Sequence, residues 1–261
     1  MRVVTIMLSC LGALASSSAQ VRVDGELKGG DRLAKPAESA QAAIGRLALP
    51  GIKINLAERS VDVAAEICLD EGTLELVACK KDSKEHESII STSANAIHIH
   101  TALLLLGAEP GNPAMRKRVG TEEEDGRWIE VPPKGDPVEV SLVIEDENGD
   151  QAERPIREFI EAADPAGETG ADDKKRAQAK KFPAHGFVFA GSHLITEGEG
   201  PRAYASDRSG NLISIATFGD ELLCLPGING HDDGSLLWQI DRTHLPEVGT
   251  RVTLRLRPKS K

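Results

Sequence analysis

The sequence predicts an α+β, β-rich fold in which several short antiparallel strands pack around one buried helix at about residues 94–107. Short apolar runs of alternating polarity recur between tight turns, which is typical of strands. One longer apolar segment has capping signals at both ends, which is typical of a helix. Strands and helices do not alternate as in a parallel βαβ sheet, so an α+β or mostly β arrangement is expected.

Four short strands are expected at the start of the domain. The segment IKINLAERSVDVAAEICLDEGTLELVAC, residues 52–79, contains three of them, joined by tight turns at AERS and DEG. HESIIS, residues 86–91, is the fourth. We expect the second and third strands to pair as a hairpin in which Leu69 faces Leu74.

The cysteines can be placed on this hairpin. Its register separates Cys68 from Cys79 by roughly 13 Å along the strands, well beyond the ~7 Å Cα limit of a disulfide. We therefore expect no disulfide between these two residues. With Cys224 the mature chain has an odd number of cysteines, which indicates a free thiol or an intermolecular bond. No CxxC motif is present, so an iron–sulfur cluster is not expected.

The helix is predicted within STSANAIHIHTALLLLGAEPG, residues 91–111. Residues 91–93 are candidate N-caps, Gly107 is a candidate C-terminal residue, and Pro110 prevents continuation. Four consecutive leucines, Leu103–Leu106, make the helix apolar on all sides. We therefore expect its C-terminal half to be buried.

Further strands follow the helix. Residues 138–144 form a strand pattern that ends at ENGD, a strong hairpin turn. More strands are expected within residues 185–195, 202–218 and 249–258, with DRSGN as a second hairpin turn.

The N-terminus has the pattern of a secretory signal peptide over residues 1–19. Arg2 supplies a positive charge, Val3–Leu14 is a short apolar run, and a small residue at Ala19 marks the cleavage position. An exported protein, periplasmic or extracellular, is therefore expected. No segment is long and apolar enough to predict a transmembrane helix.

Composition divides the remaining chain. Residues 20–46 lack a hydrophobic period and predict a mobile leader, and residues 47–258 predict a single domain. Within that domain, residues 161–181 have almost no large apolar side chains, which predicts a disordered surface insertion. The net charge of −10 argues against nucleic-acid binding, which requires clustered basic residues.

A candidate metal site lies around the predicted helix. His86, Glu87, His98 and His100 follow Cys79 closely, and imidazole, carboxylate and thiolate are ligands of zinc or copper. On a helix, His98 and His100 point about 200° apart and cannot share one ion. The predicted set is therefore His86, Glu87, His100 and Cys79. The alternative is a structural network in which these side chains satisfy one another and the helix N-terminus.

Catalytic motifs are weaker. Ser192 and His193 are neighbours on a predicted strand, so their side chains point apart. No G-x-S-x-G elbow is present, and no nucleophile–base pair or cofactor motif supports assignment of an enzymatic activity. A hydrolase is the function class with the least support.

Several motifs together resemble one family. They are CKKDSKEHESI, HIHTALLLLGAEPG, GFVFAGS, SGNLISIATFGDELLCLP and LPEVGTRVTLRLRP, and they span residues 52–258. This set resembles the YdjY-type family of exported bacterial proteins, many from planctomycetes. The resemblance implies no established reaction. Some members carry ferredoxin-like labels, but this chain lacks the cysteine run that a cluster needs.

These observations predict an envelope protein that binds a partner, either another envelope protein or a small ligand. The alternative function is a metal- or redox-linked envelope protein with its site around His86, Glu87 and His100.

Overall fold

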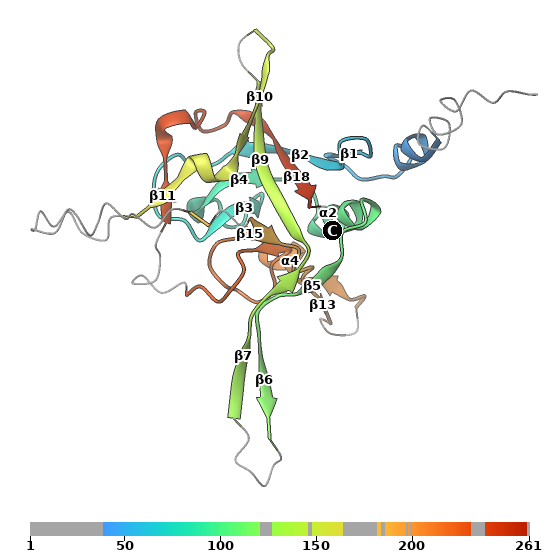
Figure 1. Ribbon diagram of the computed structural model, residues 1–261, viewed down its shortest axis with the longest axis vertical. Coiled ribbons are helices and arrows are strands. Elements are labelled where there is room, and N and C mark those ends of the chain that lie inside the picture. The colour runs from blue at the N-terminus through green and yellow to red at the C-terminus, as the bar shows by residue number, and fades with distance from the viewer. Residues whose placement is uncertain are drawn as a thin grey trace, which may run out of the picture.

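The fold is described from a computed structural model of the chain (Figure 1). The structure describes residues 39–120, 127–145, 148–163, 182–183, 186–196, 198, 200–230 and 238–259. The predicted signal peptide, the first part of the leader and the insertion from residue 164 onward lie outside the described residues. Residues 39–44, at the end of the predicted leader, form a helical segment in which Gln41 bonds the carbonyl of Ile54 at 2.7 Å.

Within the described part of the chain, eight strands form a closed barrel. Each strand pairs with the next in the order β2, β18, β9, β12, β16, β15, β3, β4, and the β4–β2 pairing completes the circle. The bounds are β2 Ser60–Ile67, β18 Arg251–Pro258, β9 Pro137–Glu145, β12 Phe187–Val188, β16 Leu223–Cys224, β15 Asn211–Ser214, β3 Leu76–Lys80 and β4 Ser88–Thr92. The β-rich character is confirmed, whereas the strands close on their own side chains and do not surround a helix.

Shorter elements flank the barrel. β1 (Ile52–Asn55) pairs antiparallel with β2, and β10 (Gln151–Pro155) pairs antiparallel with β9. The described residues also form four two-stranded ribbons: β5–β8 (Pro110–Asn112, Lys134–Gly135), β6–β7 (Met115–Val119, Arg127–Val131), β11–β17 (Ile160–Ala162, Trp238–Ile240) and β13–β14 (Leu194–Ile195, Ala203–Tyr204). Besides residues 39–44, the helices within the described ranges are α2 (Ala96–Leu105) and α4 (Ala205–Ser209), with 3-10 turns η1 (Glu85–Glu87), η2 (Ile156–Phe159) and η4 (Arg242–His244). The β6–β7 ribbon projects from the body of the molecule (Figure 1).

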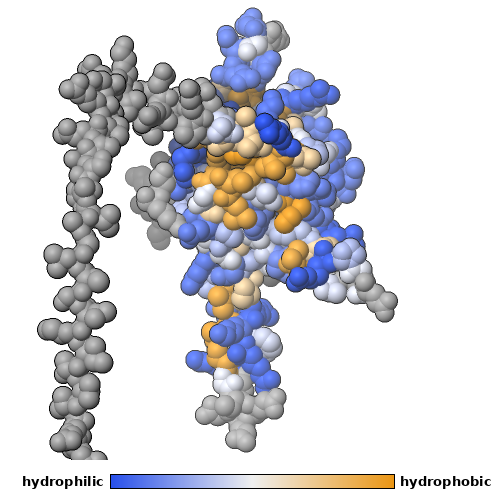
Figure 2. Space-filling view, turned by 90° about the vertical axis from the view of Figure 1, so that its right-hand side faces the viewer, coloured by the Kyte–Doolittle hydropathy of each residue, from blue (hydrophilic) through white to orange (hydrophobic). Residues whose placement is uncertain are grey.

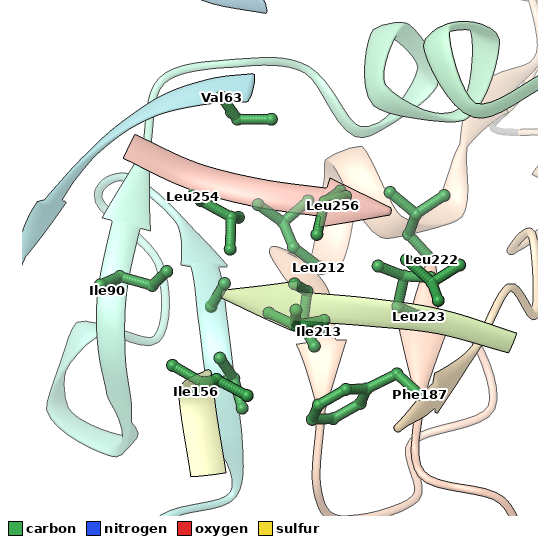
Figure 3. Close-up of a cluster of buried hydrophobic side chains, with 14 of the residues drawn as sticks. Val63, Ile90, Ile156, Phe187, Leu212, Ile213, Leu222, Leu223, Leu254 and Leu256 are labelled. Atoms are coloured by element: carbon green, nitrogen blue, oxygen red, sulfur yellow. The ribbon is translucent and has the colours of Figure 1, made fainter. Parts of the chain in front are cut away.

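The barrel interior is filled by alternate residues of its strands. In β2 and β18 every second side chain is buried, which is the period of two that the sequence shows. Val63, Leu254 and Leu256 meet Ile90, Leu212, Ile213, Leu222, Leu223 and Phe187 in this core (Figure 3). Each such aliphatic side chain contributes about 1.5–3 kcal/mol by leaving water.

The outer face of the barrel carries a cluster of ion pairs between charged residues of three strands, β2, β18 and β10. Arg255 on β18 forms a bidentate pair with Asp62 on β2, with both bonds at 2.7 Å. Glu153 on β10 accepts a bond from Arg255 at 3.0 Å and another from Arg257. These bonds hold the Glu153 pKa at about 2, mainly through the bond from Arg257.

The predicted hairpin between the second and third strands is wrong. β4 lies between β2 and β3, with Ile67 opposite Ile90 and Cys79 opposite Ser91. Leu74, which was expected to face Leu69, instead bonds through its N–H to the Trp238 carbonyl. The connection from β3 to β4 is parallel and only residues 81–87 long, although parallel crossovers ordinarily need a dozen residues or more. A parallel pairing so short gives no hairpin signal in the sequence.

The turn predictions had different outcomes. β9 and β10 pair antiparallel on either side of the ENGD segment, so that hairpin is confirmed. DRSGN instead belongs to α4 and its C-terminal cap, where Gly210 has φ +85. None of the helices in the described ranges is long and apolar enough to span a membrane.

The central helix differs from its prediction. α2 begins at Ala96 after the N-cap Asn95, because the predicted caps at residues 91–92 belong to β4. It lies beside the barrel (Figure 1) and buries one face, formed by Ala96, Ile99, Ala102 and Leu103. Leu104 and Leu105 are 45% and 42% exposed, so the expectation that the C-terminal half is buried all round is wrong.

Candidate functional site

The N-terminus of α2 is held by a carboxylate from α4. Asp207 Oδ1 accepts from the Ala96 N–H at 2.6 Å, and Oδ2 accepts from the Ile97 N–H at 3.2 Å. Lys80 Nζ donates to Asn95 Oδ1 at 2.9 Å and lies 3.4 Å from Asp207. The first N–H groups of a helix have no acceptor within the helix. The Asp207 carboxylate therefore acts as an N-cap from a distant part of the sequence, and its negative charge interacts favourably with the positive end of the helix dipole.

The middle of α2 is joined to the same region by His100. Its Nδ1 lies 2.7 Å from the Tyr204 hydroxyl, which donates its proton to the Gly191 carbonyl at 2.6 Å. The hydroxyl proton is already used, so Nδ1 must carry the imidazole proton and Nε2 holds a lone pair. Burial lowers the His100 pKa, which keeps the ring neutral at pH 7.

Gly191 is required at this contact for two reasons. Its φ is +84, and a Cβ there would stand 2.6 Å from Pro110 Cβ and 3.4 Å from His100 Cε1. The motifs around His100, Pro110 and Gly191 are therefore packed against one another at van der Waals distance.

A buried polar network continues from this point. Ser192, with φ +47, donates to the Asp220 carbonyl at 2.6 Å and accepts from the Ser206 N–H at 3.1 Å. Asn211 Nδ2 donates to Asp220 Oδ1 at 2.7 Å. The Ser192 hydroxyl thus connects its own loop to the loop at Asp220 and to α4, and it is not paired with His193. Networks of this kind specify packing.

The opposite face of α2 is apolar and open. Ile97 and Leu104 lie about two turns apart on that face, Leu105 directly follows Leu104, and the three are 36%, 45% and 42% exposed. Thr101 lies between them, and its hydroxyl donates to the Ile97 carbonyl. Hydrophobic surface gathers on the side of the molecule where α2 lies (Figure 2). The structure therefore fixes a helix tightly from one side and leaves three large aliphatic side chains on the other.

A second candidate site contains two thiols. Cys68 follows β2, and its N–H bonds the Ile89 carbonyl of β4 at 3.0 Å, while Cys79 on β3 lies opposite Ser91 of β4. Ile89 and Ser91 are alternate residues of one strand, so the two cysteines flank β4 on the same face. Cys68 Sγ donates to the Ser88 carbonyl at 3.2 Å. Each of the two thiols shifts the pKa of the other.

The two thiols shift each other's pKa values in opposite directions. The bond from Cys68 lowers the pKa of Cys79 to about 7, because the remaining thiol stabilises the thiolate. The Ser88 hydroxyl and the Lys84 N–H act in the same direction, while burial opposes them. The same thiol bond, followed by burial, raises the pKa of Cys68. Loss of one proton from the pair is therefore favoured over loss of the second.

The turn at residues 81–87 lies close to this pair. Asp82 has φ +62, and Ser83 donates to the Lys80 carbonyl, which turns the chain back toward the start of β4. The backbone of Lys84 bonds to Cys79, which is fully buried. Ser91 is 1% exposed, and its hydroxyl has no hydrogen bond of ordinary geometry within the described residues.

The structure distributes the predicted metal ligands over two places. His86 and Glu87 share η1, with Nε2 and Oε2 3.8 Å apart, and the His86 side chain is 77% exposed. Cys79 lies close to the same turn, whereas His100 has Tyr204 and Phe189 as neighbours. Among the described residues, no group of three or more His, Cys, Asp or Glu side chains is placed to hold a metal ion.

Sequence reasoning missed Cys68 and Asp207. The sequence predicts that the strands of Cys68 and Cys79 form one hairpin. In the structure β4 lies between them, and the two cysteines flank it. Asp207 caps a helix that begins more than a hundred residues earlier. The segment HESIIS, which contains most of β4, offered a signal for the placement of Cys68, because this strand could pair with β2 as well as with β3.

Comparison with known proteins gives a family and no further relative. No curated protein and no solved structure matches the chain. The family model of the YdjY domain matches residues 52–257, which include every barrel strand except the last residue of β18, together with α2, α4 and the turn at 81–87. The chain therefore belongs to the YdjY domain family.

Proposed function

We propose that this protein is an exported envelope protein that acts as a binding module, with the open face of α2 as its docking surface. The observation that carries the proposal is the exposure of Ile97, Leu104 and Leu105 on a helix held in place by Asp207 and His100. Exposed large aliphatic side chains gathered on one face favour its use as an interaction site.

The rigidity of the helix supports this role. A pre-organised surface loses little conformational freedom when a partner docks, which favours affinity. Asp207 fixes the first turn of α2 and His100 fixes the second, while the buried face packs on the barrel. The exposed leucines are therefore offered in one orientation.

The docking partner is proposed to be an amphipathic segment of another envelope protein, with basic residues beside its apolar face. Three half-exposed aliphatic side chains give on the order of 200 Å² of apolar surface, against ~800 Å² per partner in a standard interface. This area suits a helix or peptide better than a second copy of the domain. The net charge of −10 also disfavours self-association and favours a basic partner.

The export part of the proposal rests on the N-terminal sequence. Arg2 followed by the apolar run Val3–Leu14 and the small residue Ala19 supports cleavage of a signal peptide. The mass of the mature protein purified from the envelope tests it, because cleavage after Ala19 removes a defined segment.

Site-specific photo-crosslinking in the native bacterium tests the docking surface. A photoreactive residue at Leu105 is compared with one at Arg157, which is exposed on η2. We expect one discrete partner cross-linked from position 105 and not from 157, with a basic segment at the cross-linked peptide. Leu104→Glu should abolish the product and leave the melting temperature unchanged.

Two results would refute the docking proposal. One is equal cross-linking from both positions or none from position 105. The other is a product made of two copies of this chain, which would assign the face to self-association.

The second candidate function, a metal- or redox-linked envelope protein, is favoured by a separate observation. Cys68 and Cys79 are free thiols on either side of β4. The Cys68 thiol lowers the pKa of Cys79 to about 7.

A further inference from the structure

A groove opens on the outer face of the barrel where β18 and β9 separate. These strands pair as far as Thr253 opposite Val143. Beyond that point β18 stays beside β2, while β9 continues beside β10 into the hairpin that rises from the barrel (Figure 1). The groove has a volume of about 540 Å³, which is in the range of small-molecule sites. Ala64, Thr253 and Val143 form one row across β2, β18 and β9 and line the groove with short side chains.

Four charged residues line the groove, and two of them are left without a strong partner. Glu66 Oε1 and Lys81 Nζ form an ion pair at 2.6 Å. Arg251 lies opposite Glu66 in the β2–β18 register, but the carboxylate is engaged by Lys81, and within the described chain no carboxylate lies at ion-pair distance from the Arg251 guanidinium. On the other side of the groove, Glu145 accepts only a long bond of 3.4 Å from Gln151.

The separation of the strands explains why Arg251 and Glu145 do not neutralise each other. Arg251 lies two positions before Thr253, and Glu145 lies two positions after Val143, so the last paired residues of β18 and β9 precede them both. The two exposed side chains therefore stand at matching ends of diverging strands, with the groove between them.

We propose that this groove binds a small zwitterion, an α-amino acid, with its carboxylate on Arg251 and its ammonium group on Glu145. A guanidinium matches a carboxylate through two parallel hydrogen bonds. The lining carries two positive and two negative side chains, so a simple anion would meet the carboxylates of Glu66 and Glu145, and a simple cation would meet Lys81 and Arg251. A ligand with both charges avoids each repulsion.

The wall of the groove is already fixed by hydrogen bonds. Thr92 donates to the Ala64 carbonyl at 2.6 Å, and the Gly51 carbonyl accepts from the Ala64 N–H at 2.8 Å. All three residues line the groove, which joins them to Ala94 at its edge. A preformed site loses little conformational freedom on binding.

The remaining lining suits the rest of an amino acid. Ala64, Ala94 and Val143 offer apolar atoms to an aliphatic side chain. Ser91, which is 1% exposed, also lines the groove, and its hydroxyl has no partner among the described residues. Buried polar groups are nearly always satisfied, so this hydroxyl is available to a polar atom of the ligand. None of the exposed aliphatic residues of α2 lines the groove, so the inference is independent of the docking face.

An NMR titration of the isotope-labelled full mature protein tests the proposal. The probes are L-valine, isovalerate, which lacks the ammonium group of valine, and isobutylamine, which lacks its carboxylate. We expect valine to cause saturable shifts at the amides of Ala64 and Thr253. Each analogue loses one charge-assisted contact and should bind at least about tenfold more weakly.

Two substitutions assign the charges of the ligand. Arg251→Gln should weaken valine binding at least about tenfold and make valine and isobutylamine bind alike, because the carboxylate has lost its partner. Glu145→Gln should make valine and isovalerate bind alike for the corresponding reason. Arg157→Gln and Glu158→Gln are the matched controls, since both residues are exposed on η2 outside the groove, and they should leave binding unchanged.

Four outcomes would overturn the proposal. They are the absence of saturable shifts with valine in the low millimolar range, shifts confined to amides outside the groove, an analogue that binds as tightly as valine, and unchanged valine binding in Arg251→Gln. The amide spectrum of each variant shows whether it is folded, and Arg251→Lys, which keeps the charge without the paired donors, should retain part of the affinity lost in Arg251→Gln.

Discussion

Asp207→Ala is expected to loosen α2 and lower the stability of the whole domain. The carboxylate accepts from two N–H groups of the first helical turn and lies beside Lys80. No other described side chain takes these two bonds. The substitution therefore leaves two N–H groups at a largely covered helix end without a protein acceptor.

The magnitude follows from these contacts. Loss of an N-capping carboxylate costs about 0.5–2 kcal/mol. Loss of its interaction with the helix dipole adds about 0.3–1 kcal/mol. The Asp207 side chain is 15% exposed, so water replaces it only in part. We expect a loss of about 2 kcal/mol, which corresponds to a melting temperature lower by about 4–8 °C in a domain of this size.

Urea unfolding measures the loss, and hydrogen exchange locates it. In Asp207→Ala, amides of Ala96 and Ile97 should exchange faster, while those of β18 should keep their protection. Glu158→Ala is the control, since Glu158 forms an exposed pair with Arg154 at 3.4 Å and should change stability by less than about 0.5 kcal/mol. A loss for Asp207→Ala as small as that of the control would refute the capping argument.

Three further predictions concern packing and pH. Gly191→Ala should destabilise the domain by at least about 2 kcal/mol in urea unfolding, because an L-residue at φ +84 is strained and its Cβ would collide with Pro110; a neutral effect would contradict the close contact. Leu256→Ala, at the fully buried centre of the barrel, should cost about 2–5 kcal/mol, and thermal melts at two protein concentrations would show it. Glu153 has a folded pKa near 2, below its ordinary value of 4.5, so its contribution is present above pH 4.5 and is lost as the pH falls toward 2. Glu153→Gln should flatten the stability profile over that window, and an unchanged profile would assign acid sensitivity elsewhere.

The sequence predicted those features that depend on neighbouring residues. Short apolar runs between turns located the strands β2, β9 and β18, and alternation gave the interior residues of β2 because side-chain direction follows the strand period. The Asn-Gly turn located the β9–β10 hairpin because those residues suit positive φ. Barrel closure could not be predicted, because the pairing of Val61 with Leu256 joins residues that alternate equally well in many arrangements.

The candidate sites depended on long-range geometry. Leu104 and Leu105 have the composition of core residues, and only the position of the barrel decides that they face outward. Cys68 and Cys79 lie on either side of β4 only because β4 is inserted between β2 and β3. The order of such short strands in the sheet is not specified by their sequences. In contrast, the grouping of Cys79, His86 and Glu87 in one segment followed from their closeness in the sequence.

The position of β18 between β2 and β9 has a consequence for the order of folding. The bond between Asp62 and Arg255 spans 193 residues, so the barrel cannot close before that length of chain has followed β2. At roughly 5–20 residues per second, synthesis takes about 10–40 s to supply it. During this interval the edges of β2 and β9 lack their shared neighbour and can pair with other chains. Such non-local pairing also makes folding slow, so these strand edges stay unpaired for longer than any edge in a helical protein of equal length.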